Sequence, residues 1–192
     1  VVGTGITLSK DGDIFATGVT TATTFVGNVT AGKTGIGFTD TNIKVGNTAL
    51  DSLTTGTENT AVGHNALTAD TTGSSNTIVG ASCGDAVTTG SDNTAMGVSA
   101  LGTNTTGAQN TAIGRAALFT NNGNNNTGVG YYALRLNTTG TRNVAVGQEA
   151  LEANTTASYN VAVGGFALTN NTTGASNVAV GDNALDQNTT AN

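Results

Sequence analysis

The chain has 192 residues, of which only 9% are charged, and its formal net charge is −6. An acidic chain with no stripe of lysine or arginine cannot neutralise phosphates, so we expect no binding to nucleic acid. No apolar run approaches the roughly 20 residues that a membrane helix requires, so we expect no membrane insertion. The single cysteine, Cys83, excludes a disulfide framework within the chain.

The low charge, together with 28 glycines and many asparagines and threonines, fits two classes of protein. It is typical of disordered segments, and also of repeat folds whose turns use glycine and asparagine. Valine, alanine and leucine keep a fixed spacing over most of the chain, which favours a repeat fold because a disordered segment has no reason to keep one. The chain begins in a strand-like stretch and ends inside a repeat, so we expect it to be part of a longer protein.

Residues 1–41 do not follow the repeat. The segment GITLSKDGDIFATGVTTATTFVGNVT indicates a strand, a turn at residues 10–13, and then stretches rich in valine, threonine and phenylalanine. We interpret 1–41 as a fibrous β connector, with the boundary to the repeats near residue 40.

From residue 42 onward, a short strand of the form Asn-[Thr/Val]-Ala-[Val/Ile] followed by glycine returns about every 17 residues. The closing glycines are Gly46, Gly63, Gly80, Gly97, Gly114, Gly130, Gly147, Gly164 and Gly181, and one gap, between Gly114 and Gly130, is 16 residues. A unit this short cannot bury a core alone and must stack on its neighbours, and helical repeats are longer, at roughly 33–47 residues. Residues 42–192 are therefore predicted to form an all-β, parallel β-roll or β-solenoid of about nine 17-residue coils.

The alternation within each strand predicts two faces. The positions equivalent to Val62 are always apolar, so we expect them to form the core. The positions equivalent to Ala61 are nearly always small, which suggests close packing there against another chain. The Ala-Leu pair after each glycine, as in Ala66-Leu67, predicts a second short strand. The expected structural ladder comprises Asn59, Val62, Gly63, Leu67, Asn76, Val79, Gly80, Asn110, Ile113, Gly114, Asn143, Val146, Gly147, Asn160, Val163, Gly164, Asn177, Val180 and Gly181.

Asparagine recurs at two places in the repeat. The asparagine before each strand never varies within the chain, and stacked asparagine side chains can hydrogen-bond from coil to coil. The Asn-Thr-Thr triplets at 104–106, 137–139, 154–156, 171–173 and 188–190 match a glycosylation acceptor by letter. They recur together with the turn of the repeat, so we interpret them as structural.

No catalytic, metal or cofactor site is apparent. His64 is the only histidine and occupies a variable position, which indicates a surface residue, and Cys83 replaces a core alanine, which indicates a buried and inert thiol. One histidine and one cysteine provide neither a catalytic triad nor a metal ligand set. The carboxylates at 51, 85, 152 and 186 share one position, mostly in coils that are not adjacent, so no acid–base pair is expected. The calcium signature of other β-rolls is also absent.

Aromatic residues are only 4% of the chain, yet several lie with arginines near the shortened coil. These residues are Arg115, Phe119, Tyr131, Tyr132 and Arg135. Arg115 and Tyr131 occupy equivalent positions in adjacent coils, so they are expected to stack. Tyrosine and arginine are favoured at recognition surfaces, so the group is either a contact for a receptor or glycan, or ordinary surface variation.

The repeated motif Asn-[Thr/Val]-Ala-[Val/Ile]-Gly resembles the head repeats of trimeric autotransporter adhesins. The longer form with A-L-x-x-N-T-T-G looks more like the tail-fibre proteins of bacteriophages, and VTTATTFVGNVT at 19–30 resembles linkers of such fibres. The resemblance covers 42–192 and, more loosely, 1–41. It implies a left-handed β-roll, a homotrimer and a role in surface attachment. Because the repeat is longer than that of the adhesins, a ligand such as collagen is not carried over.

Two functional hypotheses follow. The first is a shaft and attachment segment of a phage tail fibre in the virion, non-enzymatic, whose partners are two further copies, other virion tail proteins and a host surface receptor or glycan. The second is the head domain of a trimeric adhesin on a bacterial surface. An ice-binding solenoid is ranked below both, because the Thr-Thr pairs lie beside a turn glycine rather than on a flat strand.

Overall fold

The computed structural model describes residues 6–8, 14–16, 30–31, 34–39 and 41–191, which contain strands and turns but no helix. Two short strands near the N-terminus, β1 (Ile6–Leu8) and β2 (Ile14–Ala16), pair in antiparallel fashion. The predicted turn at residues 10–13 and most of the segment 19–30 lie outside the described residues. No helix in the part of the chain that is described has the length and apolarity to cross a membrane.

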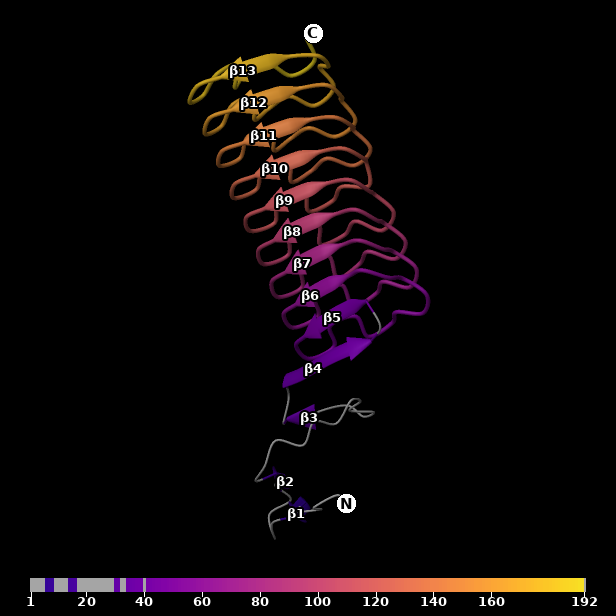
Figure 1. The fold of residues 1–192 in the computed structure, drawn as a ribbon. Helices are drawn as coiled ribbons and strands as arrows, with labels where there is room; N and C mark the ends of the chain where they lie inside the picture. Colours follow the sequence, from indigo (N-terminus) through magenta and orange to yellow (C-terminus); the bar gives the residue numbers. More distant parts are fainter. Residues whose placement is uncertain (1–5, 9–13, 17–29, 32–33, 40, 192) are drawn as a thin grey trace.

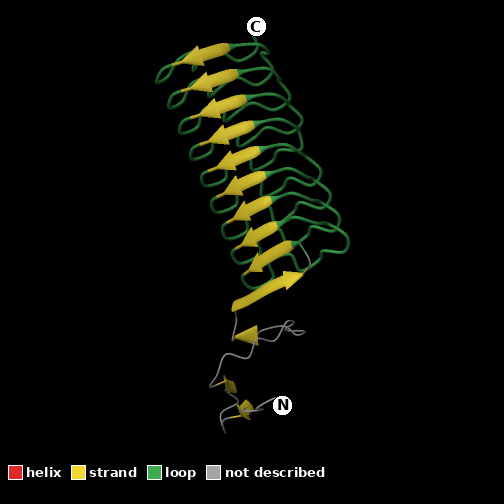
Figure 2. Cartoon of the chain, in the orientation of Figure 1, coloured by secondary structure: helices red, strands yellow, loops and turns green. Residues whose placement is uncertain are grey.

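Nine strands stack in parallel to form a solenoid (Figures 1 and 2). They are β5 (Asn42–Val45), β6 (Thr60–Val62), β7 (Thr77–Val79), β8 (Thr94–Met96), β9 (Thr111–Ile113), β10 (Thr127–Val129), β11 (Val144–Val146), β12 (Val161–Val163) and β13 (Val178–Val180). Each strand pairs with its neighbour at a sequence offset of one repeat, as Thr60 does with Thr77. The predicted all-β solenoid with 17-residue coils is confirmed, and it makes about eight turns.

The parallel stack ends on an antiparallel strand at its N-terminal side. β4 (Thr34–Thr39) pairs antiparallel with β5, and β3 (Thr30–Ala31) pairs antiparallel with β4. β4 therefore covers the edge of the first parallel strand, which would otherwise present unpaired backbone groups. The sheet of the repeats thus extends into the segment before residue 41.

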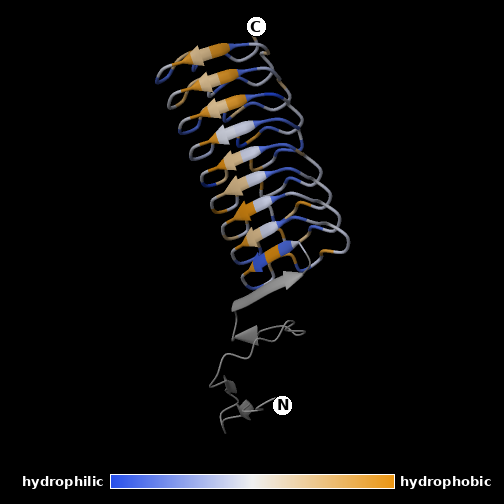
Figure 3. Ribbon diagram, viewed as in Figure 1, coloured by the Kyte–Doolittle hydropathy of each residue, from blue (hydrophilic) through white to orange (hydrophobic). Residues whose placement is uncertain are grey.

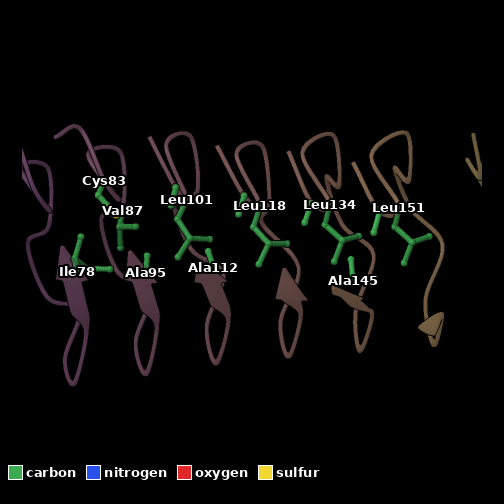
Figure 4. Close-up of a cluster of buried hydrophobic side chains, with 14 of the residues drawn as sticks. Ile78, Cys83, Val87, Ala95, Leu101, Ala112, Leu118, Leu134, Ala145 and Leu151 are labelled. Carbon is green, nitrogen blue, oxygen red and sulfur yellow. The ribbon is translucent and has the colours of Figure 1, made fainter. Parts of the chain in front are cut away.

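The core lies on the opposite face of the strands from the one that we expected. In strands β6–β13 the positions equivalent to Ala61 are buried, whereas those equivalent to Val62 are partly or largely exposed, up to 52% for Met96 in the middle of the stack. The prediction that the Val62 positions form the core was therefore wrong. The reason is the opposite wall of the coil, where Leu67 and most of its equivalents are fully buried. Figure 4 shows four of them, Leu101, Leu118, Leu134 and Leu151, filling the interior. A leucine at this position leaves room for only an alanine across from it.

The Ala-Leu segment after each glycine is not a strand, so that prediction was also wrong. Residues 64–69 form turns, and Leu67 has a left-handed backbone conformation with φ of 53°. The segment still bonds from coil to coil, since the Leu67 amide donates to the Cys83 carbonyl at 3.0 Å. The leucines are nevertheless core residues, as their spacing predicted.

Two columns of buried asparagines run along the solenoid. In the first column, the Oδ1 atom of Asn59 accepts the backbone N–H of Asn76 at 3.0 Å, and its Nδ2 donates to the Gly73 carbonyl at 2.8 Å. The second column comes from the Asn-Thr-Thr triplets, and Asn104, Asn137, Asn154 and Asn171 are fully buried. Buried amides that hold the turn cannot carry a glycan, which supports the structural interpretation of the triplets.

The missing residue of the shortened coil is lost from an exposed turn. In a full coil, Asn104 Nδ2 reaches the carbonyl of Gly107, three residues on, whereas Asn121 Nδ2 reaches the carbonyl of Gly123, two residues on. β10 consequently pairs with β9 at an offset of 16, while the alignment of the strands is unchanged. The corner glycines tolerate no side chain, because a Cβ on Gly63, at φ of +139°, would lie 2.4 Å from the Gly80 carbonyl oxygen.

One coil exchanges the sizes of its core residues. Ile78 occupies the strand position that is alanine in most coils (Figure 4). Gly84, in the same coil, occupies the position that is leucine in the others. A Cβ built on Gly84 would lie 3.4 Å from Ile78 Cγ2 and 3.6 Å from Val87 Cγ2. The large residue on one wall is thus matched by the small residue on the other.

This exchange predicts energetic coupling between the two positions. Ile78→Ala should lower the free energy of unfolding by about 2–4 kcal/mol through a cavity, and Gly84→Leu by about 1–3 kcal/mol through overpacking. The double variant I78A/G84L restores the common arrangement and should be more stable than the sum of the two losses implies by at least about 1 kcal/mol. Urea unfolding of the four proteins measures this coupling, and strictly additive losses would show that the two residues do not compensate each other.

Asp70 occupies the position of the second asparagine column two coils before that column begins at Asn104, with Val87 in the coil between. Its Oδ1 accepts the Gly73 N–H at 2.8 Å, but the buried Oδ2 has no hydrogen-bond partner within the described residues. Burial raises the pKa of Asp70 from its ordinary 3.8 to about 6. Because the folded pKa lies above the unfolded value, the folded state retains the proton more strongly. The contribution of the Asp70 carboxyl to the free energy of unfolding is therefore fully present below pH 4 and is lost as the pH rises through 6.

Asp70→Asn is expected to stabilise the protein at pH 8 by about 2 kcal/mol, because it removes a buried charge. It also supplies an Nδ2 donor for the Gly73 carbonyl, as Asn104 does for Gly107 at 3.1 Å. The gain in stability of Asp70→Asn over the wild type should shrink toward pH 4, and urea unfolding at pH values from 4 to 8 would measure it. The exposed Asp92→Asn is the matched control and should change stability by less than about 0.5 kcal/mol. A constant gain at every pH would contradict the assignment of the effect to the Asp70 charge.

Candidate functional site

The outward side chains of strands β5–β13 form one continuous surface, the outer stripe, with two columns. The first column consists of Ile43, Thr60, Thr77, Thr94, Thr111, Thr127, Val144, Val161 and Val178. The second column consists of Val45, Val62, Val79, Met96, Ile113, Val129, Val146, Val163 and Val180. Within β6–β13 these are the first and third residues of each strand, and the buried alanine, isoleucine or glycine lies between them.

The outer stripe contains no charged residue. The solvated face of a sheet normally carries polar and charged side chains. Exposed apolar patches, by contrast, mark contact surfaces. Several side chains of the second column are well exposed within the single chain, including Ile113 at 38% and Val163 at 36%. The small positions equivalent to Ala61, which we expected to face another chain, lie inside the coil. The face open to a partner is therefore the outer stripe.

A second surface, the aromatic cluster, consists of Arg115, Tyr131, Tyr132 and Arg135. The rings of Tyr131 and Tyr132 stack with their centroids 3.9 Å apart, and a side-chain hydrogen bond with Tyr132 raises the pKa of Tyr131. The Arg115 guanidinium lies 5.8 Å from the Tyr131 centroid, and that of Arg135 lies 4.6 Å from the Tyr132 centroid. The predicted contact between Arg115 and Tyr131 is thus present, at the distance of a cation–π interaction.

The two arginines of the aromatic cluster differ in their charge partners. Arg135 forms an ion pair with Glu152, with 2.7 Å between Nη2 and Oε1. No ion pair of Arg115 is present within residues 41–191. Arg115 is also exposed, so its charge is the one available to a ligand.

Phe119 is not part of this cluster, although the sequence suggested it. It occupies the position equivalent to Arg135 in the preceding coil, but its ring lies over Gly102, where a Cβ would meet Phe119 Cε2 at 2.5 Å. Sequence reasoning missed a further pair, Arg142 and Tyr159. Their side chains are joined by a 2.9 Å hydrogen bond from Nη1 to the phenol oxygen. These two residues are 17 apart, so the rule that predicted the Arg115–Tyr131 contact could also have found them.

The remaining candidates for chemistry are His64, Cys83 and Asp85. His64 is exposed, as predicted, and Cys83 is fully buried. Burial raises the pKa of Cys83 to about 12, so its thiol stays protonated at neutral pH. Burial also raises the pKa of Asp85. Among the described residues, no three histidine, cysteine or carboxylate side chains are grouped as metal ligands would be. The surfaces that the described residues offer to a partner are the outer stripe and the aromatic cluster.

Comparison of the chain with protein-family models, curated proteins and solved structures finds no match. The functional argument therefore depends on the outer stripe and the aromatic cluster.

Proposed function

We propose that the chain is a non-enzymatic shaft and attachment segment of a bacteriophage tail fibre, in which three copies associate through their outer stripes. The observation that carries this proposal is the uncharged outer stripe, which runs along all nine parallel strands. The left-handed roll and the threefold assembly come from the resemblance of the repeats to those of tail fibres and adhesin heads. The location is the virion tail, where other tail proteins are the neighbouring partners.

The repeat spacing favours a second copy as the partner of the stripe. Strands recur at about 4.8 Å along the solenoid, so nine of them give a ridge on the order of 40 Å long. A partner that fits such a ridge over its whole length must present side chains at the same spacing. Another copy of the same chain does so at every coil. A stiff rod of this kind serves to hold a receptor-binding surface away from the particle.

The assembly predicts that sedimentation of the isolated chain in native buffer yields an elongated species of three times the 18.8 kDa chain mass. Val146→Glu places a charge on strand β11 of the outer stripe and should shift the species to a folded monomer, because an unpaired charge is costly to bury. Thr139→Glu, at an exposed turn position away from the strands, is the matched control and should remain trimeric. A folded monomeric wild type would overturn the proposed assembly.

The aromatic cluster supports attachment as a second part of the proposed function. Tyr131 is 39% exposed and lies beside the unpaired Arg115. Exposed tyrosine with a free guanidinium is the composition expected of a recognition surface. We assign this surface to contact with a host receptor or glycan. The adhesin head domain remains the alternative function, and the full-length gene distinguishes the two through either a coiled-coil stalk with a membrane anchor or a virion-docking domain.

The attachment role predicts that the labelled chain binds members of a printed array of bacterial surface glycans. Tyr131→Ala should weaken this binding by about tenfold, which is the loss typical of an interface aromatic. His64→Ala removes an exposed ring at the equivalent position of another coil and should bind as the wild type does. Binding that is absent in the wild type, or unchanged by Tyr131→Ala, would remove the cluster from the attachment surface.

A further inference from the structure

The outer stripe changes its chemistry along the solenoid. From β6 to β10 the first column is threonine in every strand, and from β11 to β13 it is valine. The second column is apolar throughout. The stripe is therefore a single apolar column from β6 to β10 and a double one from β11 to β13, and β5 at its N-terminal end also has two apolar outward residues, Ile43 and Val45. Figure 3 shows β11–β13, together with β7, as the most hydrophobic strands of the sheet.

The β7 strand owes its hydropathy to a residue that does not reach the surface. Ile78 is fully buried and points into the coil, so the outward pair of this strand is Thr77 and Val79. In β11, by contrast, the two outward residues are Val144 and Val146. Within β6–β13 the double apolar surface is thus confined to β11–β13, and it forms the one run of adjacent strands of this kind among the nine parallel strands.

A partner would bury the two halves of the stripe at different costs. The hydroxyls of the outward threonines, such as Thr77 and Thr94, form no hydrogen bond with any other described residue, so water is their partner. Covering them removes that water and leaves the hydroxyl unpaired unless the partner offers an acceptor. Valine has nearly the same shape and no such requirement, so covering Val144 and Val161 releases water from apolar surface without a polar cost.

The Arg142–Tyr159 pair lies next to the double apolar part. Arg142 and Tyr159 precede the strands β11 and β12 by two residues each, and Tyr159 is 54% exposed. Tyrosine and arginine at the border of an apolar patch are the residues enriched in protein interfaces. No equivalent pair of tyrosine and arginine lies before strands β6–β10, where the equivalent positions are Glu58, Ser75, Asp92, Gln109 and Asn125.

We infer that strands β11–β13 form the principal contact between copies of this chain and fix the alignment of the copies along the fibre. The inference rests on the proposed assembly through the outer stripe. In a stack of nearly identical coils, a shift by one coil changes the first column only where it passes from Ile43 to Thr60 at the N-terminal end and from Thr127 to Val144. Such a shift would place a valine of one copy against a threonine of the next, so the boundary disfavours shifted assemblies.

The test compares two triple variants of the second column with the same chemistry. V146T/V163T/V180T makes the C-terminal strands polar, and V45T/V62T/V79T does the same at the N-terminal end of the solenoid. Dissociation of each trimer on dilution is followed by sedimentation, and circular dichroism verifies that the monomers remain folded. The C-terminal variant should dissociate at a concentration at least about tenfold higher than the N-terminal variant.

The outcomes separate this inference from the function on which it depends. If the two variants weaken association equally, or V45T/V62T/V79T weakens it more, the inference is overturned, but the proposed trimer is not. A wild-type chain that is a folded monomer at all concentrations would overturn both. A second pair of variants, T60V/T77V/T94V and V144T/V161T/V178T, checks the first column, and the valine-to-threonine set should again weaken association by about tenfold.

Discussion

The stacking of one coil on the next through buried asparagine side chains is the interaction on which the rest of the structure depends. Each asparagine of the first column accepts the backbone N–H of the next, as Asn59 does from Asn76, and donates to a turn carbonyl of the neighbouring coil. Both ends of the amide are therefore occupied without water. A coil of 17 residues has too little interior to fold alone, so these bonds, together with the strand pairs, hold the solenoid together.

The order and spacing of the strands could be predicted from the sequence because the pairing offset equals the repeat length. Which face of each strand points into the core could not be predicted from the sequence. Alternation shows that Ala61 and Val62 face opposite sides, but only the size of the facing wall decides which side is inside. Leu67 decides which face of the strand is inside, because it fills the facing wall. Leucine seldom adopts the left-handed conformation that Leu67 has, with φ of 53°, so its sequence context suggested a second strand where the structure has a turn. Ile78 and Gly84 show the same constraint with the sizes reversed.

The contacts of the candidate site could be predicted only as far as equivalent positions determine them. Arg115 and Tyr131 meet because side chains at one position stack from coil to coil, and Arg142 and Tyr159 meet for the same reason. Phe119 does not join Tyr132 even though the neighbouring position suggests it, because the absence of a side chain at Gly102 opens space on the other side. The direction of a long side chain depends on such local space, which a repeat consensus does not contain.

The reversal of the two strand faces changes what the repeat can do. If the valines were inside, the exposed face would be alanine, with little apolar area to offer a partner. With alanine inside, the larger apolar side chains of strands β6–β13, except Ile78, are directed outward on the outer stripe, while leucines of the opposite wall fill the interior. The same repeat therefore serves two tasks: its inner face and asparagines build the rod, and its outer face provides the surface for association. Selection on the outer face can then vary threonine and valine along the chain without disturbing the interior, because successive side chains of a strand point to opposite sides.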